Sequence, residues 1–180
     1  MHGHQKHAIL RQTNGRDNAY LKGDTKMAVS ALTAAKHLCE ASGWRLSNLE
    51  LQKILYNAHM VRLGQTGGTQ PLVNEEFEAW DYGPVIPELY RHVKTFGSKP
   101  VGNVFHGVPS MPPGEDQAVL NSALQTFGRK RPGELVAITH WEEGAWAKHY
   151  RPGGFGSTIP NEDVVEEYRR RFNGKPQALG

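Results

Sequence analysis

Residues 77–90 read FEAWDYGPVIPELY and join a run typical of a β-strand to the start of a helix. The first six of them include large aromatic side chains, which favour strands. Gly83 and Pro84 interrupt this run, because glycine adopts backbone angles that other residues avoid and proline lacks the N–H that a sheet ladder needs. Pro87 precedes Glu-Leu-Tyr and suits a first helical turn. The stretch therefore predicts a structural corner, formed by Gly83, Pro84 and Pro87 and surrounded by the aromatic residues Trp80, Tyr82 and Tyr90.

Two helices are expected before this corner. Ser30 has the residue type of an N-cap, for a helix that ends at Gly43. Ser47 and Glu50 form the pattern of a capping box, and the helix that follows them ends near Gly64. Its apolar residues recur at spacings of three and four: Leu51, Ile54, Leu55, Ala58 and Val61. This periodicity predicts an amphipathic helix.

The helix pair at residues 30–64 also raises an alternative function, that of a DNA-binding transcriptional regulator, because a short glycine-containing turn joins the two helices. The second helix would then have to offer polar side chains to the edges of the bases. Those available are Asn48, Gln52, Lys53 and Asn57. The wide apolar stripe beside them favours a core helix instead, so we expect no nucleic-acid partner.

Further helices are expected after the corner. One begins at Pro84 or Pro87 and ends before Gly97. The others are expected at residues 115–127, 132–143 and 161–172. Residues 97–114 are too rich in Gly and Pro for a regular element, and residues 151–160 are expected to form a turn-rich connection. The predicted fold class is mainly α (α+β): a compact bundle of about five to six helices, with a short strand or β-hairpin near residues 72–82.

Charge and composition divide the 180 residues into three parts. Residues 1–26 contain five Lys/Arg and two acidic residues, which account for the whole net charge of +3. We therefore expect a flexible basic tail at 1–27, one domain at 28–174 and a disordered C-terminus at 175–180. The domain is balanced in charge, which argues against a broad nucleic-acid-binding face. With no apolar run of membrane-spanning length and no signal sequence, a cytoplasmic protein is expected.

Motifs that carry chemistry are absent from the sequence. It contains no HExxH, GxSxG or Walker pattern, and Cys39 is the only cysteine. His140 with Glu142 or Glu143 is the best acid–base pair that can be drawn, but a histidine on the flank of a helix is more often structural. We expect no enzymatic activity, no catalytic residues, no metal site and no cofactor.

Three blocks of sequence share their order with a known family: LQKILYNAH (51–59), EAWDYGPVIPELY (78–90) and THWEEGAW (139–146). An acidic C-terminal helix follows them. In this arrangement residues 28–172 resemble the SocA-like antitoxins, whose shared domain is called Panacea. The second block is the most specific of the three.

This resemblance implies a mostly helical fold and an antitoxin that neutralises a cognate toxin by direct protein–protein binding. The toxin would be SocB-like or another neighbouring gene product. For the SocA type, the resemblance further implies a proteolytic adaptor that delivers the toxin to the ClpXP protease. The family provides no catalytic residues. The candidate partner-binding residues, taken from the second and third blocks, are Trp80, Tyr82, Tyr90, His140, Trp141 and Trp146.

Overall fold

The computed structural model describes residues 27–153 and 156–172. The elements in chain order are α1 (Ala31–Ala41), α2 (Asn48–Gln65), β1 (Phe77–Trp80), β2 (Gly83–Val85), α3 (Pro87–Val93), the 3-10 helix η1 (Lys94–Phe96), α4 (Glu115–Phe127), α5 (Pro132–Thr139), α6 (Ala145–His149), β3 (Ser157–Ile159) and α7 (Asn161–Phe172). The predicted class, mainly α with a short β segment, is confirmed. The segments 1–26 and 175–180, predicted as a tail and a disordered end, lie outside the described residues.

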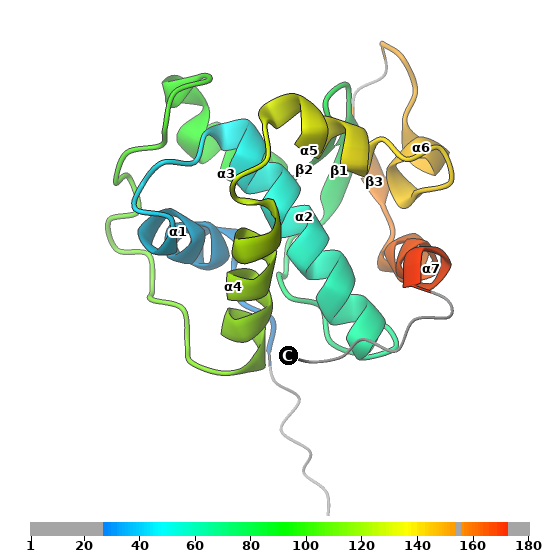
Figure 1. Ribbon diagram of the computed structural model, residues 1–180, viewed down its shortest axis with the longest axis horizontal. Coiled ribbons are helices and arrows are strands. Elements are labelled where there is room, and N and C mark those ends of the chain that lie inside the picture. Colours follow the sequence, from blue (N-terminus) through cyan, green and yellow to red (C-terminus); the bar gives the residue numbers. More distant parts are fainter. Residues whose placement is uncertain (1–26, 154–155, 173–180) are drawn as a thin grey trace, which may run out of the picture.

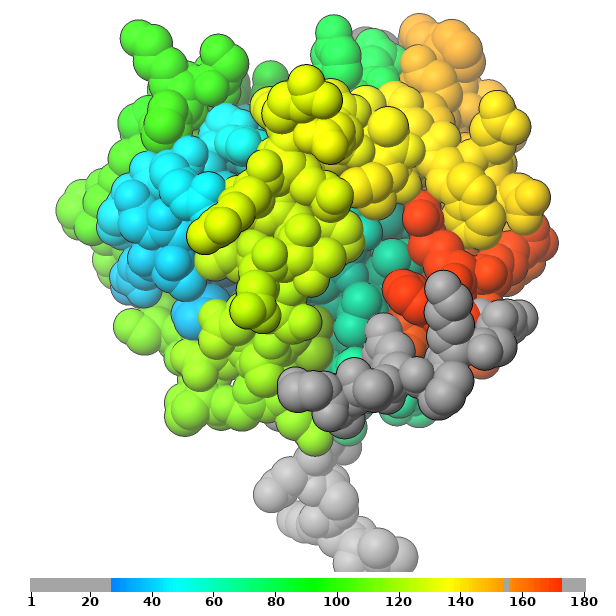
Figure 2. All heavy atoms as spheres, in the orientation of Figure 1, coloured from blue at the N-terminus to red at the C-terminus, as the bar shows by residue number. Residues whose placement is uncertain are grey.

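Helix α2 is the centre of the fold (Figure 1). Helices α1 and α4 lie on one side of it, and the sheet and α7 lie on the other. Every residue from 51 to 60 is buried. Figure 2 shows α4 and α5 covering most of α2 on the viewed face. The sequence period predicted a single apolar stripe, but neighbours on several sides bury the polar flank of this helix as well.

The predicted caps of the first two helices are confirmed. The Ser30 hydroxyl accepts the N–H of Thr33 at 3.1 Å, and α1 begins there. At α2 the Glu50 carboxylate accepts the backbone N–H of Ser47 at 2.7 Å, completing the capping box. Both caps satisfy backbone N–H groups that have no partner inside the helix.

The three strands form one antiparallel sheet in the order β2-β1-β3. Trp80 pairs with Gly83 and Ala79 pairs with Pro84, so β1 and β2 are a hairpin. The sequence predicted that Gly83 and Pro84 end the β structure. In the structure these two residues begin its second strand instead. Proline is tolerated because β2 is an edge strand, where a missing N–H does not interrupt a ladder on both sides. The next helix begins at Pro87.

Strand β3 lies in residues 151–160, which were predicted as a turn-rich connection; the end of that segment is a strand instead. Its Cα partners in β1 include Phe77 with Ile159 and Ala79 with Ser157. Thr158 and Ile159 favour a strand, but a run of three residues between Gly and Pro is too short to predict one, so pairing with a distant strand defines the element. The loop at 97–114 holds no helix or strand, as expected, and it packs on the body through buried Val101 and Phe105.

The helix predicted at residues 132–143 is shorter than expected, and a second short helix lies beyond its predicted end. Helix α5 ends at Thr139, a turn follows, and α6 begins at Ala145. Gly144 lies in the break, and its N–H donates to the carbonyl of Trp141 at 2.8 Å. A Cβ at Gly144 would lie 3.0 Å from that carbonyl, so the tight turn favours glycine.

Candidate functional site

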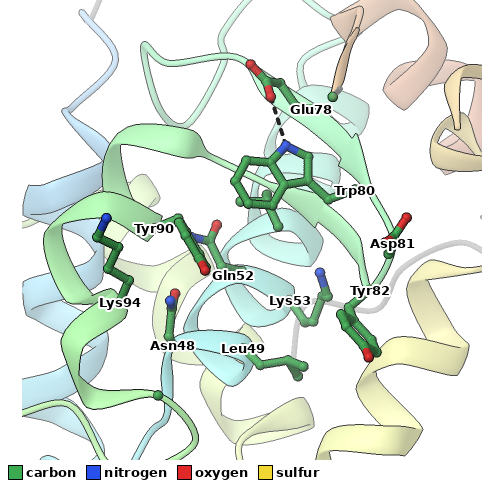
Figure 3. A pocket seen from close by; sticks show the side chains of 13 residues that line it. Asn48, Leu49, Gln52, Lys53, Glu78, Trp80, Asp81, Tyr82, Tyr90 and Lys94 are labelled. Carbon is green, nitrogen blue, oxygen red and sulfur yellow. Dashed lines mark hydrogen bonds between the residues drawn. The ribbon is translucent and has the colours of Figure 1, made fainter. Parts of the chain in front are cut away.

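A pocket of about 780 Å³ lies between the N-terminal half of α2, the β1–β2 hairpin and the segment α3–η1 (Figure 3). The side chains that line it are Asn48, Leu49, Gln52, Lys53, Glu78, Trp80, Asp81, Tyr82, Val85, Tyr90 and Lys94. The most specific block of the sequence, residues 78–90, thus supplies one wall. The buried face of α2 supplies the floor.

Aromatic rings dominate the outer part of the pocket. The rings of Trp80 and Tyr90 meet edge to face, with centroids 5.0 Å apart. Tyr82 projects from the hairpin turn with 70% of its surface exposed, and Tyr90 is 37% exposed. With Met27, these are the large apolar side chains exposed in the described part of the chain. Exposed tyrosines beside a tryptophan have the composition of a protein-binding surface.

Lys53 is the charged group at the floor of the pocket. Only 1% of its surface is exposed, and its Nζ donates to the carbonyl of Pro84 at 2.8 Å. Among the described residues, no carboxylate forms an ion pair with it. Burial lowers the pKa of Lys53 from 10.5 to about 7, because the charged amine loses its hydration.

Two further polar side chains of α2, those of Gln52 and Asn48, line the same pocket. The amide of Gln52 accepts the N–H of Ile86 at 2.9 Å and donates to the carbonyl of the same residue at 3.3 Å, which ties the hairpin exit to α2. Asn48, at the start of the helix, is 6% exposed. Its Oδ1 is buried and accepts no hydrogen bond. Such an acceptor is costly to leave unmatched.

The sequence did not identify Asn48, Gln52 and Lys53 as pocket residues, because polar positions on a helix are normally read as its solvent face. The burial of these polar side chains also argues against the alternative function of DNA binding, in which α2 would be the recognition helix. Gln52, Lys53 and Asn57 are each no more than 2% exposed, so none of them can reach the edge of a base. No feature of the sequence period distinguishes this arrangement from an amphipathic surface helix.

The third sequence block packs behind the hairpin. The Trp146 indole N–H donates to the carbonyl of Trp80 at 2.8 Å, and its ring stacks on His140 with centroids 3.8 Å apart. Trp146 is 8% exposed. The pKa of His140 is lowered, chiefly because the ring is partly buried and also because the charge of Lys53 disfavours a second positive charge nearby. These contacts join the second and third blocks into one unit, in which Trp146 supports the pocket wall from the inside.

The six predicted site residues thus fall into three places. Trp80, Tyr82 and Tyr90 line the pocket, while His140 and Trp146 lie behind its wall. Trp141 lies apart from both, under the guanidinium of Arg171, which is 4.6 Å from the centre of its ring.

Other chemistry finds little support in the described part of the chain. Glu142 and Glu143 are exposed, and Glu143 pairs with Arg170 at 3.5 Å. No group of three or more His, Cys, Asp or Glu side chains suited to a metal ion occurs within residues 27–153 and 156–172. Over the same residues, no helix is long and apolar enough to cross a membrane.

Comparison with known proteins identifies relatives of this chain. The family model described as "Antitoxin SocA-like, Panacea domain" matches residues 51–108, which span most of α2, the hairpin and α3. The chain is 39% identical over 138 residues to "Antitoxin SocA" of Caulobacter vibrioides (strain NA1000 / CB15N), a match that covers 69% of this chain and 72% of that protein. No solved structure matches it.

Proposed function

This chain belongs to the SocA-like antitoxins, the family of the Panacea domain, and we propose that it is an antitoxin that neutralises a cognate toxin by direct protein–protein binding. The observation that carries the proposal is the 39% identity to antitoxin SocA over 138 residues. The toxin is SocB-like or another protein encoded beside this chain.

The aromatic rim of the pocket, formed by Trp80, Tyr82 and Tyr90, is the surface on which we place the toxin. Tyr82 and Tyr90 are exposed without packing against the core, and Trp80 holds Tyr90 in place through its edge-to-face contact. Tyrosine and tryptophan give much contact area for little loss of side-chain entropy. His140 and Trp146 act on this surface through the hairpin that they support, and Trp141 is a separate candidate contact.

A finer part of the proposal is that the antitoxin also serves as a proteolytic adaptor, delivering the toxin to ClpXP. Its support is the similarity to SocA. An adaptor and a simple blocker differ in what happens to the toxin. If this chain is an adaptor, the half-life of the toxin is shorter when the chain is present, and this shortening requires ClpXP.

Co-expression tests the proposal. A tagged copy of this chain is produced with the protein encoded next to it and captured, and the complex is separated by size exclusion. We expect co-elution of a partner that is toxic when produced alone. The change of Tyr82 and Tyr90 together to Ser should abolish capture. The matched control is Met27→Ser, which removes the other exposed large apolar side chain of the described residues and should leave capture intact.

A further inference from the structure

The buried amine of Lys53 has unused capacity to bind an anion. A protonated lysine has three N–H donors, and the carbonyl of Pro84 takes one of them. The residue is 1% exposed at the floor of the pocket, and no carboxylate within the described residues neutralises it. In Figure 3 its nitrogen points toward the space between Trp80 and Tyr82. A ligand carboxylate would supply the missing counter-charge in a desolvated place, where charge-assisted hydrogen bonds are strong.

Asn48 adds a second unsatisfied group on the same floor. Its Oδ1 is buried without a donor, and the residue is 6% exposed. The group that satisfies it must be an N–H or O–H. A peptide provides N–H groups along its length as well as a carboxylate, so an extended peptide across the floor can satisfy both Lys53 and Asn48, which lie about 7.5 Å apart along the axis of α2.

The walls of the pocket define the rest of the ligand. Trp80, Tyr82 and Tyr90 surround the floor with rings that favour an apolar or aromatic side chain. Two acids also line the pocket, but each already has a partner: Glu78 accepts the Trp80 indole N–H at 2.8 Å, and Asp81 accepts the Tyr150 hydroxyl at 2.9 Å. In Figure 3 their carboxylates point away from Lys53, so they leave the floor open to an anion.

We propose that this pocket binds the carboxylate of an acidic peptide segment, with Lys53 as its counter-ion, Asn48 as acceptor for a backbone N–H of the same segment, and the aromatic rim around a neighbouring apolar side chain. The proposal deepens the proposed function and rests on it in one respect, because the segment would belong to the toxin. The carboxylate is either the end of a chain or the side chain of an aspartate or glutamate.

Small probes test the site on the full chain without the toxin. N-acetyl-L-phenylalanine carries a terminal carboxylate, an N–H and a ring, and an N-acetyl-Asp-Phe-amide peptide carries its carboxylate on a side chain. The neutral control is N-acetyl-L-phenylalaninamide. Each is titrated against the ¹⁵N-labelled protein while the indole N–H signal of Trp80 is followed. We expect saturable shifts with at least one acid, and binding at least tenfold weaker with the neutral amide. The tighter of the two acids identifies the source of the carboxylate.

Three variants complete the experiment. Lys53→Met should weaken binding of the acid at least tenfold, whereas Lys36→Met, which removes another lysine bonded to a backbone carbonyl at 2.8 Å, should not. Asn48→Asp places a negative charge on the floor, at a helix N-terminus that tolerates it, and should also abolish binding. Equal binding of acid and neutral amide, no binding of either acid, or unchanged binding by Lys53→Met overturns the proposal.

The two proposals fail separately. If the Lys53→Met variant captures the neighbouring toxin with the wild-type affinity, the proposed role of this pocket is refuted and the antitoxin function still stands. Binding of the acidic probes without any captured neighbour would support the pocket and count against the antitoxin function.

Discussion

Alkaline pH should stabilise this fold, because Lys53 is buried without a counter-ion. Its pKa is about 7 in the folded protein, against 10.5 for an unperturbed lysine such as that of the unfolded chain. Between these two pH values the unfolded chain binds more protons than the folded one, so stability rises as pH increases through that window. One pKa unit corresponds to about 1.4 kcal/mol. Integration from pH 7 to pH 9 gives a gain of about 2 kcal/mol in the free energy of unfolding.

Urea unfolding at pH 7, 8 and 9 measures this gain, with Lys53→Met as the reference protein. Burial also raises the pKa of Cys39 to about 12, so its thiol opposes the gain as the unfolded cysteine ionises near pH 9. Both proteins retain Cys39, so the difference between their two pH profiles isolates Lys53. Parallel profiles would refute the reasoning, because they would mean that Lys53 titrates equally in the folded and unfolded states.

Three further predictions concern stability. Gly83→Val should cost about 2–4 kcal/mol, because Gly83 has φ 100 and its Cβ would lie 2.7 Å from the Thr139 hydroxyl; an unchanged melting temperature would contradict this. Burial lowers the pKa of His59 to about 4, so stability should fall by up to about 3 kcal/mol as pH drops from 6.5 to 4, and His59→Gln should flatten that part of a urea-derived profile. Arg62→Met should cost about 3–5 kcal/mol in chemical denaturation, because it removes the buried guanidinium that pairs with buried Asp116 at 2.7 Å. The exposed pair of Arg131 and Glu134 is the control, and Arg131→Met should cost less than about 1 kcal/mol; equal losses would show that burial is not the cause.

Local signals account for the parts of the fold that the sequence predicted. The capping box of Ser47 and Glu50 involves residues three apart, so the start of α2 can be read directly. Helix α7 was recognisable from acids in its first turn and arginines in its last. Strand β3 and the entry of Gly83 into a strand depend instead on pairing with β1, which no local pattern encodes.

Some residues of the candidate site could likewise be predicted from local sequence, and others could not. The block at residues 78–90 located Trp80, Tyr82 and Tyr90, because these aromatics stand out beside a turn. Lys53 was missed because its burial results from the hairpin that folds over it, and the hairpin carbonyl that it binds is 31 residues away. Helical periodicity reports which face is apolar, and it cannot show that the polar flank is covered too.

Growth rescue tests the central claim most directly. Cells induce the neighbouring gene alone, or together with this chain, its Tyr82/Tyr90 double serine variant, or Met27→Ser. Neutralisation by direct binding through the aromatic rim predicts that growth stops with the neighbour alone, returns with the wild type and Met27→Ser, and does not return with the double variant. A toxic neighbour that the wild-type chain fails to neutralise would contradict the account, as would a neighbour that leaves growth unaffected.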